Sequence, residues 1–395
     1  MAKPKIRFKG YTNDWEQRRL GDIAAETYGG GTPKTSNEEF WKGNIPWIQS
    51  SDLIDECLFD VKLRKFISQE AVSKSATKIV PQNSIAIVTR VGVGKLAFMP
   101  FSYATSQDFL SLSGLKTDPE FTVYALYKMM QSVSNEVQGT SIKGVTKEEL
   151  LAKKIMIPGC NEQKKIGAYL YTLDHLITLH QRKCDQAKKL KKYMLQKMFP
   201  KNNERVPEIR FEGFSNDWEQ RKVGEFLTES RESGHKGDIA HKMTVKLWGK
   251  GVYEKNDAGS ANTQYFTRHA GQFIYSKLDF LNCAFGVVPE ELESLETTAD
   301  VPAFDCDGVN PYFMFYTAIQ SSFYEKNGMI ADGSRKAKRI HADAFLDMPF
   351  IVPCLEEQNK IVTLLNELDN LLTLHQKKCD QLKNLKKFML QNMFV

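Results

Sequence analysis

The feature that most constrains this chain is an internal repeat made of two separate parts. The segment Ile6–Gly21 returns as Ile209–Gly224, with 11 of 16 positions identical. The segment Glu162–Phe199 returns as Glu357–Phe394, with 25 of 38 positions identical. The order is therefore a start motif, a long middle block and a helical segment, followed by the same three parts again.

The two middle blocks, about residues 22–150 and 225–345, show no convincing residue-by-residue match. Shared ends imply shared packing partners, whereas divergent middles imply that the two blocks contact different things. We therefore interpret the chain as a duplicated frame that holds two different binding domains. The alternative is an old duplication whose middle blocks simply drifted apart, although drift is expected to erode the ends as well.

Composition sets wider limits. The 395 residues suffice for two to four domains, and 42% hydrophobic with 26% charged residues is ordinary for a soluble globular protein. The formal net charge of +6 is compatible with a polyanionic partner without requiring one. Seven cysteines, an odd number with no Cys-x-x-Cys pair, favour a reducing compartment. Since the basic N-terminus lacks an apolar core and no apolar run approaches about 20 residues, we expect a cytoplasmic protein.

The repeated segments 162–199 and 357–394 are each predicted to form one long helix. Apolar and small residues recur in them at alternating steps of four and three, the period of a coiled-coil seam. The predicted seam consists of Ile166, Leu170, Leu173, Ile177, His180 and Cys184 in the first helix and Ile361, Leu365, Leu368, Leu372, His375 and Cys379 in the second.

Both helices show an apparent slip in this pattern. After Ala187 and Leu382 the next leucine follows after three residues instead of four, which predicts a local distortion of the supercoil. In that interpretation the stripe continues through Leu190, Met194 and Met198, and through Leu385, Met389 and Met393.

The direction of the helices follows from the connections. Only the short polar segment Lys201–Pro207 separates the first helix from the second start motif, so the second block lies near the end of one helix and the beginning of the other. If the helices pack on each other, they must run antiparallel. Each helix of 38 residues spans about 57 Å at 1.5 Å per residue. Since a turn of DNA measures about 34–36 Å, the helices suit a spacer between two domains on one duplex. Mere helix packing is the alternative.

The middle blocks are predicted to be α+β domains. Strand-like runs occur at Ser84–Thr89 and Gly271–Ser276, and helix-like runs at Phe121–Gln131 and Tyr312–Tyr324. Several loops combine glycine or small polar residues with cations, as expected for contacts to phosphate, although each loop taken alone is more typical of a solvated turn. The candidate DNA-binding residues are Lys34, Thr35, Arg90, Lys95, Lys143, Arg231, Lys236, Lys246, Lys277, Arg335, Lys336, Lys338 and Arg339.

Motifs of catalysis are missing from the sequence. It has no phosphate-binding loop and no dinucleotide-binding fingerprint. Asn310-Pro-Tyr-Phe313 resembles a motif of DNA amino-methyltransferases, but one proline is missing. A zinc site formed by His180, Cys184, His375 and Cys379 is geometrically possible in an antiparallel pair, yet seams of coiled coils commonly hold such residues. We therefore expect no catalytic residue and no bound metal.

The chain as a whole resembles the specificity subunits of Type I restriction–modification systems. Three pieces carry the resemblance: Gly29–Lys34 followed by Asn44–Asp52; the apolar block ends Ile155–Pro158 and Pro349–Pro353; and the twin Glu-Gln-x-Lys-Ile helix starts. The helix starts begin at Glu162 and Glu357. Each piece is moderately specific, whereas their duplicated order over the whole chain is highly specific.

The resemblance implies an α+β fold with two target-recognition domains separated by two long antiparallel helices in a pseudo-two-fold, circular arrangement. The implied boundaries are 1–155 and 201–350 for the domains and 156–200 and 351–395 for the spacer helices.

The resemblance also implies a function. Each domain would read one half of a bipartite DNA site, and the helices would set the gap and dock two methylation subunits. S-adenosylmethionine, Mg²⁺ and ATP would be bound by these and by two restriction subunits, not by this chain. A coiled-coil scaffold without DNA readout, a self-contained DNA enzyme and the specificity subunit of another multi-subunit modification system remain as alternatives.

Overall fold

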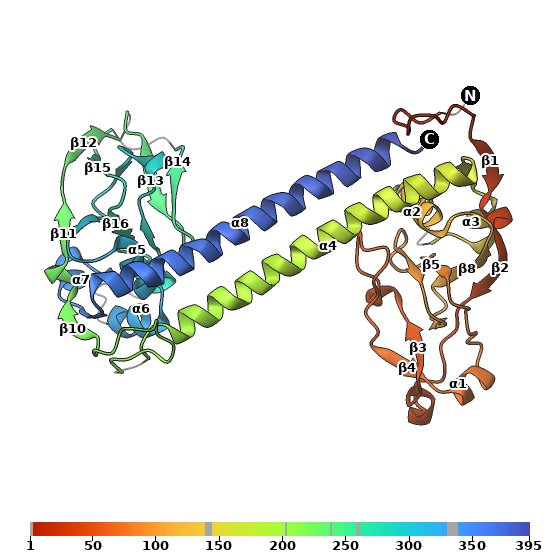
Figure 1. The fold of residues 1–395 in the computed structure, drawn as a ribbon, viewed down its shortest axis with the longest axis horizontal. Coiled ribbons are helices and arrows are strands. Elements are labelled where there is room, and N and C mark those ends of the chain that lie inside the picture. Colours follow the sequence, from red (N-terminus) through yellow and green to blue (C-terminus); the bar gives the residue numbers. More distant parts are fainter. Residues whose placement is uncertain (1–2, 139–143, 202–203, 238, 258–260, 330–338) are drawn as a thin grey trace. The chain divides into compact units, whose positions relative to one another are not determined.

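The computed structural model describes residues 3–138, 144–201, 204–237, 239–257, 261–329 and 339–395. The chain divides into two compact units. Unit 1 comprises residues 1–182 and 376–395, and unit 2 comprises residues 183–375. Two long helices, α4 (Cys160–Lys197) and α8 (Leu355–Asn392), each contribute to both units (Figure 1).

Unit 1 is built around a four-stranded antiparallel sheet with the order β2-β8-β5-β6. Its central strand β5 is buried on both faces, because Ile85 and Ile87 pack with helix α2 while Ala86 and Val88 face a second apolar cluster. This explains why β5 appears in the sequence as a continuous apolar run. The bounds are β2 Ala24–Gly29, β5 Ser84–Val88, β6 Leu96–Met99, β8 Phe109–Leu115 and α2 Pro119–Gln138.

A smaller three-stranded sheet, in the order β4-β3-β7, lies beside it in unit 1. Its middle strand pairs antiparallel with β4 and parallel with β7. The side chain of Trp47 is buried in this sheet and donates a hydrogen bond to the carbonyl oxygen of Gly31 (3.0 Å). The bounds are β3 Ile45–Ile48, β4 Lys65–Ile67, β7 Ala104–Thr105 and, for the adjoining helix, α1 Gln69–Ser73.

Unit 2 contains a four-stranded sheet of the same topology, in the order β11-β19-β16-β17. Its second sheet differs, because it has five strands in the order β12-β15-β18-β13-β14. The strands of the first sheet are β11 Leu227–Ser230, β16 Phe273–Tyr275, β17 Phe285–Val287 and β19 Ala303–Cys306. Those of the second are β12 Ser233–Lys236, β13 Lys242–Val245, β14 Val252–Lys255, β15 Gln264–Thr267 and β18 Glu296–Thr297.

The helices of the two units differ from the predictions in detail. The helix expected at Phe121–Gln131 is part of the longer α2, whereas the one expected at Tyr312–Tyr324 is two helices, α5 (Pro311–Ala318) and α6 (Ser321–Gly328). Short helices α3 (Lys147–Ala152) and α7 (Ala342–Leu346) precede the last strand of each unit. The α+β class is confirmed.

The start motif closes each unit in the same way. In unit 1, β1 (Glu16–Arg19) pairs antiparallel with β9 (Lys154–Ile157); in unit 2, β10 (Glu219–Lys222) pairs with β20 (Pro349–Val352). An arginine of each start motif also forms a bidentate ion pair with the buried glutamate that begins the repeated helical segment. The pairs are Arg7–Glu162 (2.6 and 2.8 Å) and Arg210–Glu357 (2.7 and 2.8 Å).

The glutamine after each of these glutamates makes a second set of hydrogen bonds that is the same in both units. In unit 1, Gln163 donates to the carbonyl oxygen of Pro158 and accepts from the backbone N–H of Asp118, which caps α2. In unit 2, Gln358 makes the same two bonds, and Asn310 caps α5. Asn310-Pro-Tyr-Phe is thus an N-cap followed by proline at the first helical position, which accounts for that sequence without catalysis.

The two long helices run antiparallel within each unit. In unit 1, Asp174 of α4 pairs with Lys386 of α8 (2.5 Å), while Gln181 accepts a hydrogen bond from Cys379, seven residues further along α4 and seven residues back along α8. In unit 2, Lys191 pairs with Asp369 (2.6 Å). The predicted antiparallel direction is therefore confirmed.

The predicted slip in the seam is wrong. Leu190 and Leu385 are exposed, whereas Lys191 and Lys386, one residue later, lie in the seam position and are largely buried. The steps of four and three therefore continue without interruption. A lysine satisfies the apolar period here because its four methylenes are buried while its ammonium group reaches an aspartate of the other helix.

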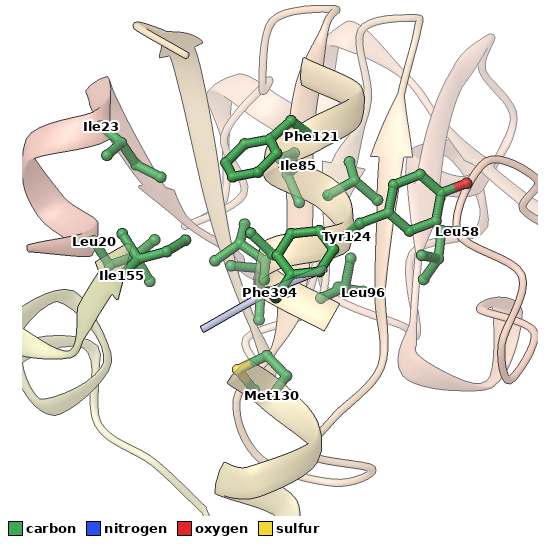
Figure 2. Close-up of a cluster of buried hydrophobic side chains, with 14 of the residues drawn as sticks. Leu20, Ile23, Leu58, Ile85, Leu96, Phe121, Tyr124, Met130, Ile155 and Phe394 are labelled. Atoms are coloured by element: carbon green, nitrogen blue, oxygen red, sulfur yellow. The ribbon is translucent and has the colours of Figure 1, made fainter. Parts of the chain in front are cut away.

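The C-terminal end of α8 completes the core of unit 1. Phe394 stacks on Phe121 of α2 (5.5 Å between ring centroids), and both belong to the buried cluster of Figure 2. Its ring also packs nearly perpendicular to that of Trp15. The backbone N–H of Ile6 donates to the carbonyl oxygen of Asn392, so the two chain ends meet in this unit (Figure 1). In unit 2 the equivalent contacts are made by residues in the middle of the chain. Phe199 stacks on Phe313 next to Trp218, and the backbone N–H of Ile209 donates to the carbonyl oxygen of Lys197.

Candidate nucleic-acid interface

Loops of unit 1 gather at one edge of its four-stranded sheet. The backbone N–H of Thr89, directly after β5, donates to the carbonyl oxygen of Asp108, and the N–H of Val145 donates to the carbonyl oxygen of Thr89. Ser106, directly after β7, donates its N–H to the carbonyl oxygen of Ile48 at the end of β3. We call this surface the loop edge of unit 1; it consists of residues 30–35, 49–51, 64–65, 89–95, 106–108 and 144–145.

Unit 2 has a matching loop edge formed by residues 246–251, 276–284, 298–302 and 339–340. The N–H of Lys277, two residues after β16, donates to the carbonyl oxygen of Asp300, and the N–H of Ile340 donates to that of Lys277. These are the same two backbone bonds that Thr89 makes in unit 1. This equivalence could not be predicted from the sequence, because the bonds join backbone groups and leave the side chains free to differ.

Residues 30–35 of unit 1, which we call the glycine loop, are held in place by buried side chains. The carbonyl oxygen of Gly31 accepts hydrogen bonds from Trp47 and Thr77, and its N–H donates to the carbonyl oxygen of Thr105. A Cβ at Gly30 would lie 1.8 Å from the carbonyl oxygen of Ser106, so only glycine fits. Lys34 and Thr35 follow directly and are exposed at the loop edge.

Two further predicted cations of unit 1 lie in the turn between β5 and β6. Arg90 is exposed. Lys95 is ion-paired with Asp55 (2.9 Å), so it is less available to an anion than the sequence suggested. Between them, Val91 is an exposed apolar side chain at the tip of the turn. The turn therefore presents one cation and one apolar group to solvent.

The sequence reasoning missed a second set of polar side chains at this edge. Lys65 at the start of β4 lies over the rings of Trp41 and Trp47 (5.6 and 5.5 Å) and donates to the amide oxygen of Gln49 (3.4 Å). Gln49 in turn donates to the hydroxyl of Ser51 (3.0 Å). Such fixed cations and amides are suited to phosphate oxygens and base edges. The signal in the sequence that could have predicted this group is the occurrence of Trp41 and Trp47 together with Lys65, which suggests a cation–π contact.

The predicted cations of unit 2 are spread over several strands. Lys277 is half-buried, and Arg339 lies 3.7 Å from the Asp300 carboxylate beside it. Lys246 is exposed over the ring of Tyr253 in a loop whose backbone bonds to Asn282 and Cys283. These three belong to the loop edge.

The other predicted cations lie elsewhere. Arg231 follows β11 and is ion-paired with Glu229 (2.6 Å), and Lys236 ends β12, where it is exposed. Lys143, Arg335, Lys336 and Lys338 fall outside the described residues.

The predicted helix-pairing residues divide by burial. Ile177, His180, Leu372 and His375 are only half-buried, whereas the other eight are buried. The buried ones are Ile166, Leu170, Leu173, Cys184, Ile361, Leu365, Leu368 and Cys379. In the described part of the chain no group of three or more His, Cys, Asp or Glu side chains is placed to hold a metal ion. Among the helices described, none combines the length and the apolar character that crossing a bilayer requires.

Each unit also presents exposed apolar side chains on the long helices, outside the seam. Counted from the seam, Tyr171 and Leu355 lie on one flank, whereas the other seven occupy two adjacent positions on the opposite flank of their helix. In an antiparallel pair the flanks that carry these seven lie on the same side. The seven are Leu179, Leu385 and Phe388 in unit 1, and Leu190, Tyr193, Leu371 and Leu374 in unit 2. We call each set an apolar flank.

Tyrosines connect the globular part of each unit to the helix pair. Tyr124 of α2 donates to Asp174 (2.6 Å), and Tyr316 of α5 donates to Asp369 (3.0 Å) and Asn366 (2.9 Å). Burial, reinforced by the neighbouring aspartate, raises the pKa of Tyr124 far above its usual range, and the same causes raise that of Tyr316. Both phenols therefore remain protonated donors at neutral pH.

Comparison with known proteins agrees with this architecture. Residues 12–189 match the family model of the Type I restriction modification DNA specificity domain. The chain is 27% identical over 238 residues to the Type I restriction enzyme MjaIX specificity subunit of Methanocaldococcus jannaschii. It is 32% identical over 182 residues to the EcoR124I/EcoR124II specificity subunit of Escherichia coli. These alignments cover 54% and 43% of this chain and 52% and 43% of the two relatives, so the chain spans about half the length of each.

The likeness in fold extends over the whole chain. The crystal structure of a Type I restriction-modification system S subunit from M. genitalium superposes with a TM-score of 0.64 at 13% identity. The superposition covers 100% of this chain and 99% of that one. This likeness shows the fold, and the family model with the two relatives confirms the resemblance to Type I specificity subunits that the sequence motifs predicted.

Proposed function

We propose that this chain is the DNA-specificity subunit of a Type I restriction–modification complex and acts in the cytoplasm. Each unit reads one half of a bipartite target through its loop edge, and the two long helices set the gap between the halves. The single observation that supports this most is the combination of one shared frame with two different second sheets. The arginine–glutamate pair of the frame repeats in both units. The second sheet, by contrast, has three strands in unit 1 and five strands in unit 2.

The loop edges support contact with DNA because they carry the elements of both kinds of readout. Exposed cations such as Lys34 and Arg90 suit phosphates, and fixed amides such as Gln49 suit base edges in the major groove. The DNA-binding roles proposed from the sequence are best supported for Lys34, Thr35, Arg90, Lys246, Lys277 and Arg339, and those of the other seven candidates stay predictions. Lys95, Arg231 and Arg339 have carboxylate partners that DNA phosphates would have to displace.

The apolar flanks support the docking of partner subunits. An exposed set of leucines and aromatic rings is costly to leave in water and is typical of an interaction site. Because each unit has one such flank, the chain suits two copies of the methylation subunit. In this proposal the methylation subunits hold S-adenosylmethionine and the restriction subunits hold ATP and Mg²⁺, so this chain contributes recognition and no catalytic group.

The decisive experiment exchanges the reading domains inside the shared frame. Leu20 and Lys153 are joined by a backbone bond in unit 1, and Val223 and Met348 are joined by the same bond in unit 2. Replacing residues 223–348 by residues 20–153 therefore joins the chain at equivalent points. Expressed with its methylation subunits, the parent chain is expected to give adenine methylation at two unlike half-sites. The exchanged chain is expected to give the first half-site twice, in opposite orientations. Loss of the first half-site while the second persists would contradict the proposal.

A second experiment tests the spacing. Inserting four residues into each helix lengthens it by about 6 Å, close to two base pairs. The tolerated gap is expected to change while both half-site sequences stay the same. A change of the half-site sequences with an unchanged gap would show that the helices do not set the spacing.

A further inference from the structure

A buried carboxylate without a full set of partners lies under the loop edge of unit 1. Asp52 is completely buried, and its Oδ2 accepts a hydrogen bond from the backbone N–H of Gln49 (3.0 Å). Its Oδ1 is also buried but accepts no hydrogen bond from any residue that the structure describes. The group that faces this oxygen is the guanidinium of Arg64, with Nε 3.6 Å away. Burying a carboxylate oxygen in this state is unfavourable, so its retention calls for a reason.

The backbone brings Arg64 to this place. Lys62 donates its N–H to the carbonyl oxygen of Asp52, and Leu53 forms a β-bridge with Val61. The segment after Val61 therefore passes over the carboxylate before β4 begins at Lys65. Although the carboxylate is buried, the Arg64 side chain is 52% exposed, so its inner edge faces Asp52 and the rest of the group faces solvent.

This geometry orients a planar donor. When Nε faces a carboxylate, the two terminal nitrogens of the guanidinium remain available on its outer edge as a pair of parallel donors. Such a pair matches the N7 and O6 acceptors that guanine presents in the major groove. A contact to phosphate needs no such orientation, so an exposed lysine of the loop edge such as Lys34 is sufficient for it.

We propose that Arg64, oriented by the buried Asp52, reads a guanine in the half-site of unit 1. This rests on the proposed function and adds to it a specificity-determining residue and the base that it recognises. Gln49 and Ser51 are joined to each other, and Gln49 also donates its backbone N–H to Asp52. Gln49 in addition accepts from Lys65, the residue after Arg64. Gln49 and Ser51 therefore belong to the same recognition surface.

The test uses the full chain, co-expressed with its methylation subunits in a host without other adenine methylation, and maps methylated adenines over the genome. Arg64→Ala is expected to relax one G·C position of one half-site, lowering the preference for that pair by roughly 5- to 150-fold. The other half-site is expected to stay unchanged. Arg64→Lys keeps the charge but loses the paired donors, so it is expected to relax the same position. Lys74→Ala is the matched control, because Lys74 is an exposed cation of the same unit paired with the exposed Glu70; its motif is expected to equal that of the parent.

Asp52→Asn tests the positioning role. The variant keeps the shape of the side chain but removes the charge that faces Nε, so partial relaxation at the same position is expected. Thermal unfolding of each variant shows whether it is folded. If Asp52→Asn does not fold, the comparison of Arg64→Lys with the parent chain tests the proposal instead.

The outcomes separate the inference from the proposed function. If the parent chain directs no sequence-specific methylation, the proposed function itself fails. If the parent gives a bipartite motif and Arg64→Ala lowers methylation uniformly, with Arg64→Lys restoring it, Arg64 contacts phosphate and the inference is overturned. A first half-site without any G·C pair would overturn it as well.

Discussion

Each unit has an equivalent lysine–aspartate ion pair between the long helices, and the two pairs differ in burial. Replacing Asp174 in one variant and Asp369 in another by alanine therefore tests how burial changes the contribution of such a pair to stability. The Lys386 and Asp174 side chains of unit 1 are 9% and 18% exposed, whereas Lys191 and Asp369 of unit 2 are 20% and 43% exposed. Within the described residues, Asp174→Ala leaves the buried ammonium group of Lys386 with a long hydrogen bond to the carbonyl oxygen of Glu56 (3.4 Å) and with nearby aromatic rings.

The expected magnitudes follow from these surroundings. Breaking a buried pair by removing one partner costs about 3–5 kcal/mol. Asp174→Ala also removes the acceptor of the Tyr124 hydroxyl, so the upper part of that range is expected. Asp369→Ala is expected to cost about 1–2 kcal/mol, because its pair is better solvated and Tyr316 keeps Asn366 as an acceptor.

Hydrogen exchange measured by mass spectrometry reports both units of one sample separately. Asp174→Ala is expected to speed exchange in the α4 and α8 segments of unit 1 by roughly 10²- to 10³-fold or more, against about 5- to 30-fold in unit 2 for Asp369→Ala. The double variant Asp174→Leu with Lys386→Met serves as control and is expected to recover most of the loss, because it leaves no buried charge. Equal effects of the two aspartate substitutions would refute the reasoning from burial.

Three further predictions follow from single contacts. Phe394→Ala removes a buried ring from the core of unit 1 and is expected to cost about 3 kcal/mol or more of unfolding free energy, measured by urea denaturation. Hydrogen bonds to Glu293 and then Glu232 raise the pKa of His269 above 6.5, so this stabilisation is complete below pH 6.5 and is lost as the pH rises through the raised value. An NMR titration of the imidazole is expected to show a midpoint above 6.5 that falls in Glu293→Gln. Gly30→Ala forces the glycine loop away from a neighbouring carbonyl oxygen and is expected to impair methylation-site recognition in one half-site only, as mapped methylated adenines would show.

Much of the frame was predictable from the repeats. Closely similar start motifs and helix beginnings imply equivalent packing partners, and the structure supplies them as Arg7–Glu162 and Arg210–Glu357. The antiparallel direction was predictable because the short linker after Phe199 leaves no other path for the second helix. Both inferences use short-range patterns or chain connectivity, which a sequence displays directly.

The candidate site was less predictable. Lys95 counted as a phosphate ligand in the sequence, but Asp55 is its partner in the structure; Arg64 was not singled out, because its relation to Asp52 depends on a bridge between strands. The shared topology of the two four-stranded sheets was also hidden. Backbone bonds such as those of Thr89 and Lys277 place no demand on side-chain identity.

By itself, the sequence determined the helical period, the duplicated frame and the existence of two unlike blocks, since each is written in the spacing or repetition of residues along the chain. Tertiary structure decided which charges are buried and which face solvent. Leu190 and Lys191 show the difference: the apolar residue is exposed and the cation lies in the seam, because an aspartate from a helix almost two hundred residues away meets the ammonium group there. Burial and pairing of charge are decided by contacts between distant segments, and no local pattern contains them.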